Sequence, residues 1–148
     1  MIIFIDDEKW TISAYFDHFN EKADEEADER YKCKHFFYPT EAWKYIEEHK
    51  DEIGLIILDL MLFYGEIRRR RRPGLHGGLV FLEEIRDDPQ YNNIPILIYT
   101  LVSDVAIESK GFNLKEIKNV YYLPRDCSDK EFYTKVNELL NKKISSSR

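Results

Sequence analysis

The chain has 148 residues, which is enough for one domain with its own core. Its 43% hydrophobic and 34% charged residues are typical of a globular protein, and its net charge of −6 argues against nucleic acid as a partner, because phosphate binding requires a basic surface. Cys33 and Cys127 form no metal-binding motif, and no apolar run approaches the ~20 residues of a membrane span. We therefore expect a cytoplasmic protein with no membrane insertion.

The first half of the chain predicts three strands and two helices in alternation. Residues 2–5 (IIFI) are apolar throughout, which predicts a strand covered on both faces. Apolar residues at helical spacing over 12–19 predict a helix of about four turns. Residues 31–37 (YKCKHFF) predict an edge strand, and Thr40 is a candidate cap for a second helix. Residues 55–58 (LIIL) predict another fully buried strand.

The second half continues the alternation. A third helix is expected after Gly78, followed by a buried strand over 94–99 (IPILIY) and a weak helix after Ser103. Residues 120–123 (VYYL) predict a second edge strand. The S-x-x-E capping box at Ser128 predicts the start of the last helix.

This order predicts an α/β fold of the flavodoxin-like (βα)5 type, a doubly wound parallel sheet with strand order 2-1-3-4-5. The two weaker strands occupy the edges in that order. We assign residues 1–143 to a single domain, with a lengthened basic loop at 63–77, and residues 144–148 to a polar tail.

Reactive side chains follow four of the five predicted strands. Asp6 and Asp7 follow the first strand, Asp59 the third, Thr100 the fourth, and Arg125 comes shortly after the fifth. Ligand sites in open α/β sheets lie at the carboxyl ends of the strands, so the three carboxylates are expected to meet. They cannot all stay ionised without a cation, and oxygen ligands suit Mg²⁺.

Asp59 stands at the tip of a central apolar strand, which suits a nucleophile that attacks phosphorus to form an acyl phosphate. Each residue also has an ordinary structural interpretation. Asp6 and Asp7 could cap the first helix, Asp59 could be a turn residue, and Thr100 could be a loop hydroxyl. The combination at neighbouring strand ends favours the functional interpretation.

The segments IIFIDDE, LIILDLML, GGLVFLEEIR, IPILIYT and YYLPRD together resemble the response-regulator receiver domain of two-component signalling. The resemblance covers nearly the whole chain, so we expect a stand-alone receiver that signals by protein contacts. It implies that Asp6, Asp7 and the backbone carbonyl of Met61 hold Mg²⁺. It also implies that Asp59 accepts a phosphoryl group from a phosphohistidine on a sensor histidine kinase or phosphotransfer protein.

The same resemblance implies a conformational switch. Thr100 and Arg125 would contact the phosphoryl group, and Tyr122 would be the aromatic residue that turns inward on activation. The face formed by the fourth helix, fifth strand and fifth helix would signal to an unknown downstream protein or form a homodimer. Self-phosphorylation and self-dephosphorylation of Asp59 would be the only chemistry.

Three residues depart from the family pattern. Arg125 replaces the usual lysine, Asp126 the usual proline after it, and Leu101 the usual small residue after Thr100. They motivate an alternative, an atypical receiver that is never phosphorylated and acts as a constitutive interaction module. A Mg²⁺-dependent phosphohydrolase of the haloacid dehalogenase type is a third hypothesis, but it requires a second aspartate where this chain has Met61.

The loop at 63–77 contains a run of five arginines. It is either a solvated segment without a role or a docking loop for an acidic partner, nucleic acid, or the acidic segment 21–30 of another copy. The candidate docking residues are Arg68, Arg69, Arg70, Arg71 and Arg72.

Overall fold

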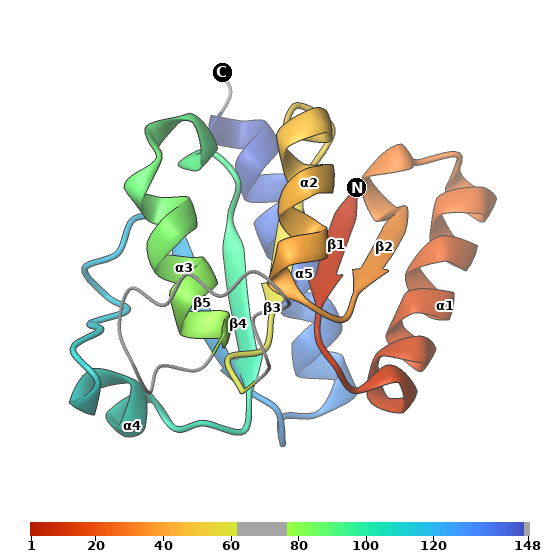
Figure 1. The fold of residues 1–148 in the computed structure, drawn as a ribbon. Helices are drawn as coiled ribbons and strands as arrows, with labels where there is room; N and C mark the ends of the chain where they lie inside the picture. The colour runs from red at the N-terminus through yellow and green to blue at the C-terminus, as the bar shows by residue number, and fades with distance from the viewer. Residues whose placement is uncertain (62–76, 147–148) are drawn as a thin grey trace.

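The computed structural model describes residues 1–61 and 77–146 of the chain. Five parallel strands form one sheet. They are β1 (Ile2–Ile5), β2 (Cys33–Phe36), β3 (Leu55–Leu58), β4 (Ile96–Thr100) and β5 (Val120–Pro124). Their order is β2-β1-β3-β4-β5 (Figure 1), which confirms the predicted fold class and topology. The three apolar runs form the central strands and are buried along their whole length, whereas β2 and β5 lie at the edges.

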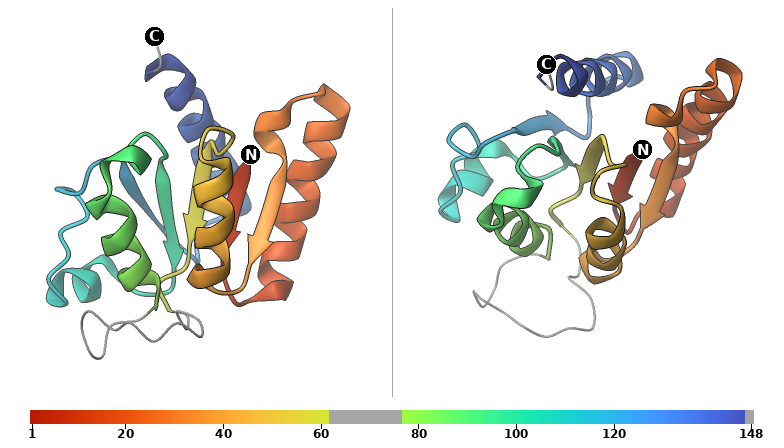
Figure 2. Two further views of the ribbon diagram at one scale, coloured as in Figure 1. Left: turned by 45° about the horizontal axis from the view of Figure 1, so that its top comes forward. Right: turned by 90° about the horizontal axis from the view of Figure 1, so that it is seen from above.

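Helices cover both faces of the sheet (Figure 2). One layer consists of α1 (Lys9–Glu26) and α5 (Asp129–Ser146). The opposite layer consists of α2 (Pro39–His49), α3 (Gly77–Asp87) and α4 (Asp104–Ser109). Short 3-10 helices occupy Glu29–Tyr31 and Pro89–Tyr91.

Alternation along each strand divides the core into two parts. In β4, Ile96 and Ile98 pack beneath α3, whereas Leu97 and Tyr99 pack beneath α1 and α5. Continuous hydrophobicity therefore reflects burial on both faces of the sheet.

The predicted helix signals are confirmed in two places. Ser103 caps α4, with its hydroxyl accepting a hydrogen bond from the Ala106 amide at 3.1 Å. Ser128 and Glu131 form the capping box of α5, because the Ser128 hydroxyl accepts from the Glu131 amide at 3.2 Å and the Glu131 carboxylate accepts from the Ser128 amide at 3.4 Å.

Three helix boundaries differ from the prediction. Thr40 does not cap α2: the helix begins one residue earlier at Pro39, because the fixed φ of proline suits the first helical position. The first helix is longer than the four turns expected and ends where Ala27 adopts the left-handed conformation. The last helix continues to Ser146, beyond the expected start of the tail at residue 144.

Residues 62–76 lie outside the described part of the chain, so the loop prediction and Arg68, Arg69, Arg70, Arg71 and Arg72 have no structural description. Among the residues that are described, no helix is both long and apolar enough to cross a membrane. Cys33 and Cys127 are both free thiols.

Candidate functional site

The register of the sheet brings the predicted site residues together. Ile5 of β1 pairs with Leu58 of β3, and the Asp59 amide donates to the Ile5 carbonyl at 3.0 Å. Asp6 and Asp59 therefore follow neighbouring strands at the same edge of the sheet. Thr100 ends β4, the next strand beyond β3, so its side chain lies beside Asp59.

The three carboxylates converge as predicted. One ligand oxygen from each of Asp6, Asp7 and Asp59 lies within 4.8 Å of the other two. Asp6 and Asp59 are buried, and Asp7 is exposed at the surface. Three carboxylate oxygens at this spacing form a donor set that suits a hard divalent cation such as Mg²⁺.

Burial dominates the electrostatics of Asp6. Desolvation raises the pKa of Asp6 to about 6, against the opposing effects of the Arg125 guanidinium and of the Glu8 amide, which donates to Asp6 Oδ1 at 2.8 Å. The pKa of Asp7 is raised by partial burial and by the negative charge of Asp59. The site is therefore short of positive charge. The predicted capping role is not seen, because α1 begins after Glu8 without a side-chain cap.

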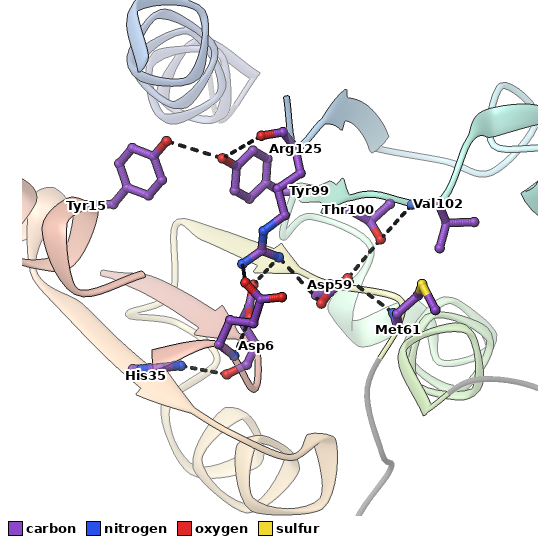
Figure 3. A network of polar contacts seen from close by, with 10 residues as sticks. Asp6, Tyr15, His35, Asp59, Met61, Tyr99, Thr100, Val102 and Arg125 are labelled. Carbon is purple, nitrogen blue, oxygen red and sulfur yellow. Dashed lines mark hydrogen bonds and ion pairs between the residues drawn. The ribbon is translucent and has the colours of Figure 1, made fainter. Parts of the chain in front are cut away.

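Arg125 is the cation of the site (Figure 3). Its side chain is only 6% exposed, and Nη1 lies 2.7 Å from Asp6 Oδ2 and 3.5 Å from Asp59 Oδ2. Nη2 lies 3.6 Å from a carboxylate oxygen of Glu8. Although Nη2 is buried, it has no hydrogen-bond partner among the described residues. Within the described residues, Nη2 therefore keeps a hydrogen-bond donor that could serve another acceptor.

A line of hydrogen bonds leads away from Asp59 on the other side. The Thr100 hydroxyl donates to Asp59 Oδ1 at 2.8 Å, and the Met61 amide donates to the same oxygen at 3.2 Å. Thr100 Oγ1 accepts from the Val102 amide at 3.3 Å. The Tyr122 hydroxyl donates to the Val102 carbonyl at 2.8 Å, so the predicted switch residue is connected to the site through one peptide segment.

A cavity of about 430 Å³ opens onto these groups. The exposed side chains of Met61 and Leu101 line it, with 51% and 71% of their surface accessible. Leu101, which follows Thr100, therefore lines the same cavity as Asp59 and does not fill it. The complete lining is Asp7, Glu8, Asp59, Met61, Leu101 and Arg125.

The sequence did not predict which residues pack against Arg125 and Asp6. The Tyr99 ring lies 5.1 Å from the guanidinium carbon, and its hydroxyl is 3.2 Å from the Tyr15 hydroxyl (Figure 3). The Tyr15 hydroxyl donates to Asp129 at 2.9 Å. On the other side, the His35 ring is bonded to the Asp6 carbonyl at 2.7 Å. Strand alternation would have placed Tyr99 on the sheet face opposite Thr100, but only the packing shows what it contacts.

Solved structures of receiver domains resemble this chain along nearly its whole length. A receiver domain protein from Clostridium thermocellum is 21% identical, with a TM-score of 0.65 and coverage of 97% of this chain and 95% of that one. The chain has the receiver-domain fold. A two-component response regulator from Legionella pneumophila is 18% identical, with a TM-score of 0.59 and coverage of 97% of both chains.

The Mn²⁺-bound form of response regulator Rcp1 also shares the receiver fold. It is 19% identical, with a TM-score of 0.54, and the match covers 93% of this chain and 89% of that one. No family model and no curated protein matches the sequence. The receiver fold therefore rests on likeness of structure, and the roles of the individual site residues stay predictions.

Proposed function

We propose that the chain is a receiver that accepts a phosphoryl group on Asp59 in a Mg²⁺-dependent reaction and signals by protein contacts. The observation that carries this proposal is the surroundings of Asp59. Its buried carboxylate is bonded to the Thr100 hydroxyl at 2.8 Å, lies beside the Arg125 guanidinium, and shares a cluster with Asp6 and Asp7.

In the proposed reaction, an Asp59 carboxylate oxygen attacks the phosphorus of a phosphohistidine. The product is an acyl phosphate, in which this oxygen is bonded to the phosphorus. The phosphorus–nitrogen bond breaks, and its electron pair stays on the imidazole, which takes up a proton. The charge on the transferring oxygens needs stabilisation, and Nη2 of Arg125, which is buried and has no hydrogen-bond partner among the described residues, is a donor placed to contribute it.

The carboxylates of Asp6, Asp7 and Asp59 fit a Mg²⁺ ion in chemistry and spacing. We propose that Asp6, Asp7, Asp59 and the Met61 carbonyl hold it, and that it supplies charge neutralisation at the phosphoryl oxygens. Among the described residues, Arg125 is the cation that pairs with these carboxylates, so the three carboxylates and the guanidinium have a charge of −3 + 1 = −2 when all are ionised. A divalent ion would balance that charge.

We propose that the signal travels through Thr100 and Tyr122. Once Asp59 carries a phosphoryl group, the Thr100 hydroxyl gains new oxygen acceptors and leaves Asp59 Oδ1. The Val102 amide is bonded to that hydroxyl and the Val102 carbonyl to Tyr122, so the segment and the ring would move together. The surface formed by α4, β5 and α5 would then change shape for a downstream protein or a second copy.

We further propose that the phosphoryl donor is a sensor histidine kinase or phosphotransfer protein, and that the protein acts in the cytoplasm. The receiver fold supports a signalling role of this kind. Beyond the reaction of Asp59 with its own phosphoryl group, no enzymatic activity is proposed.

The test is incubation with Mg²⁺ and acetyl phosphate, followed by intact mass measurement. The wild type should gain one phosphoryl group, and Asp59→Asn should gain none. Asp51→Asn is the matched control, because Asp51 is exposed and precedes β3, whereas Asp59 follows the opposite end of that strand, so it should react like the wild type. An unchanged wild-type mass at several pH values and donor concentrations would contradict the proposal.

One observation favours a second candidate, the constitutive interaction module. Arg125 pairs directly with Asp6 and Asp59, so the chain itself partly balances the negative charge of these two carboxylates. That candidate requires partner binding to survive Asp59→Asn unchanged. A loss of binding in the variant, with its fold intact by circular dichroism, would reject it.

A further inference from the structure

The Arg125 guanidinium must be held in a particular orientation because it is planar. A guanidinium is planar and has several fixed donors, so its contacts depend on the orientation of its plane, whereas an ammonium is a point charge. Here Nη1 is shared between Asp6 and Asp59 while the side chain is almost entirely buried. We therefore expect another side chain to pack against the guanidinium plane and fix its orientation.

Tyr99 provides that surface. The guanidinium carbon lies 5.1 Å from the centre of its ring, within the range of cation–π contacts, and Tyr99 is only 2% exposed. The Tyr99 hydroxyl also donates to the backbone carbonyl of Arg125 at 3.4 Å. One residue thus contacts both the side chain and the main chain of Arg125.

Tyr99 is itself fixed by α1 and α5. Each phenol has one proton, and that of Tyr15 is donated to Asp129 at 2.9 Å. The contact of 3.2 Å between the Tyr15 and Tyr99 hydroxyls must then use the proton of Tyr99, which is shared with the Arg125 carbonyl. The ring is also held by Phe132 of α5, with the ring centres 4.8 Å apart.

From this geometry we infer that Tyr99 is a positioning residue that holds the Arg125 guanidinium against Asp6 and Asp59, with Tyr15 and Asp129 fixing Tyr99 in turn. Tyr99 lies on the sheet face opposite Thr100, so it does not contact the cavity or the reacting oxygens. The inference deepens the proposed function, but the position of Arg125 can be measured without metal or phosphate.

The first measurement is the Nε–H signal of Arg125 in a ¹H–¹⁵N spectrum of the metal-free protein, assigned by its absence in Arg125→Lys. In the wild type it should be shifted upfield by the Tyr99 ring and protected from solvent exchange. The shift should persist in Tyr99→Phe and be lost in Tyr99→Leu. A wild-type signal at the position of exposed arginines overturns the inference without any variant.

Tyr121→Leu is the matched control. Tyr121 lies on the neighbouring strand, β5, and its ring lies near Lys135 and Lys142. Its hydroxyl donates to Asn119, which precedes β5, whereas Arg125 follows the opposite end of the strand. Its loss should leave the Arg125 signal unchanged. An equal change in Tyr121→Leu and Tyr99→Leu would show general loosening of the fold and would also overturn the inference.

The second measurement is Mg²⁺ affinity by calorimetry. Release of the guanidinium removes a positive charge that opposes the metal, so Tyr99→Leu should bind Mg²⁺ roughly three- to tenfold more tightly than the wild type. The difference should vanish in an Arg125→Gln background. Damage to the site would instead weaken binding in both backgrounds, and that result contradicts the inference. If the wild type bound no Mg²⁺, the proposed function would fail while the metal-free spectra still decided the position of Arg125.

Discussion

Gly78→Ala adds a single methyl group and should disturb the site strongly. The Gly78 amide donates to the Leu60 carbonyl at 3.3 Å, so α3 begins directly against the segment that carries Asp59. A Cβ at this position would overlap the Asp59 carbonyl oxygen and the Leu60 Cα, and it would lie 2.9 Å from the Leu60 oxygen. These are all backbone atoms, so the overlap cannot be relieved by a side-chain rotation.

Overpacking of this kind costs about 1–3 kcal/mol, and the better helix propensity of alanine returns at most about 1 kcal/mol. We expect Gly78→Ala to lower the free energy of unfolding by about 2 kcal/mol, or Tm by roughly 4–8 °C for a domain of this size. Displacement of Asp59 should also slow phosphorylation by acetyl phosphate roughly tenfold or more.

Gly54→Ala is the control for this prediction. Its Cβ would lie 3.1 Å from a methyl carbon of Leu140, the end of a flexible side chain, so the contact can relax. Urea denaturation of both variants, with phosphorylation rates, separates the two cases. If Gly78→Ala were as stable as Gly54→Ala and reacted at the wild-type rate, the reasoning about the backbone contact would be refuted.

Three further predictions concern buried groups. Thr100→Val should lower the free energy of unfolding by about 1–2 kcal/mol in urea denaturation, because it removes a hydroxyl donor from a buried carboxylate; an unchanged value would contradict the hydrogen bond. Mg²⁺ affinity measured by calorimetry should fall about tenfold between pH 7 and pH 5, because burial raises the pKa of Asp6 to about 6 and protonation removes its charge; a flat profile would contradict this. With a thiol reagent, Cys127 should react in the native protein, whereas burial excludes Cys33 and raises its pKa to about 12, so it should react only after denaturation; simultaneous reaction would contradict this.

The central strands and the convergence of carboxylates were predictable because both depend on local patterns. A run such as 55–58 has one stable environment, a strand covered on both faces, and the carboxyl ends of parallel strands meet at one edge. The pairing of neighbouring strands then brings Asp6 and Asp59 together, independently of the conformation of the connecting loops. The predicted cap at Thr40 was wrong because Pro39 occupies the first helical position, which the fixed φ of proline favours.

The support of Arg125 was not predictable from the same patterns. Alternation assigns Tyr99 to a face of the sheet, but the path of a long arginine side chain depends on what surrounds it in three dimensions. Tyr15, Tyr99 and Asp129 come from α1, β4 and α5, and only the packed fold brings their polar atoms together. The sequence showed a departure at Arg125 without showing the residue that accommodates it.

The charges of the proposed site explain why a cation that is always ionised suits position 125. With a divalent ion bound, the three carboxylates, the guanidinium and the metal sum to −3 + 1 + 2 = 0. Phosphorylation would replace the single charge of Asp59 with about −2 on the phosphoryl group, so the sum becomes about −1. Without Arg125 it would be about −2 in a buried site, which is costly. Nη2, which has no hydrogen-bond partner among the described residues, is the donor that can face this added charge, and because arginine keeps its proton at all physiological pH values, the compensation would not depend on pH.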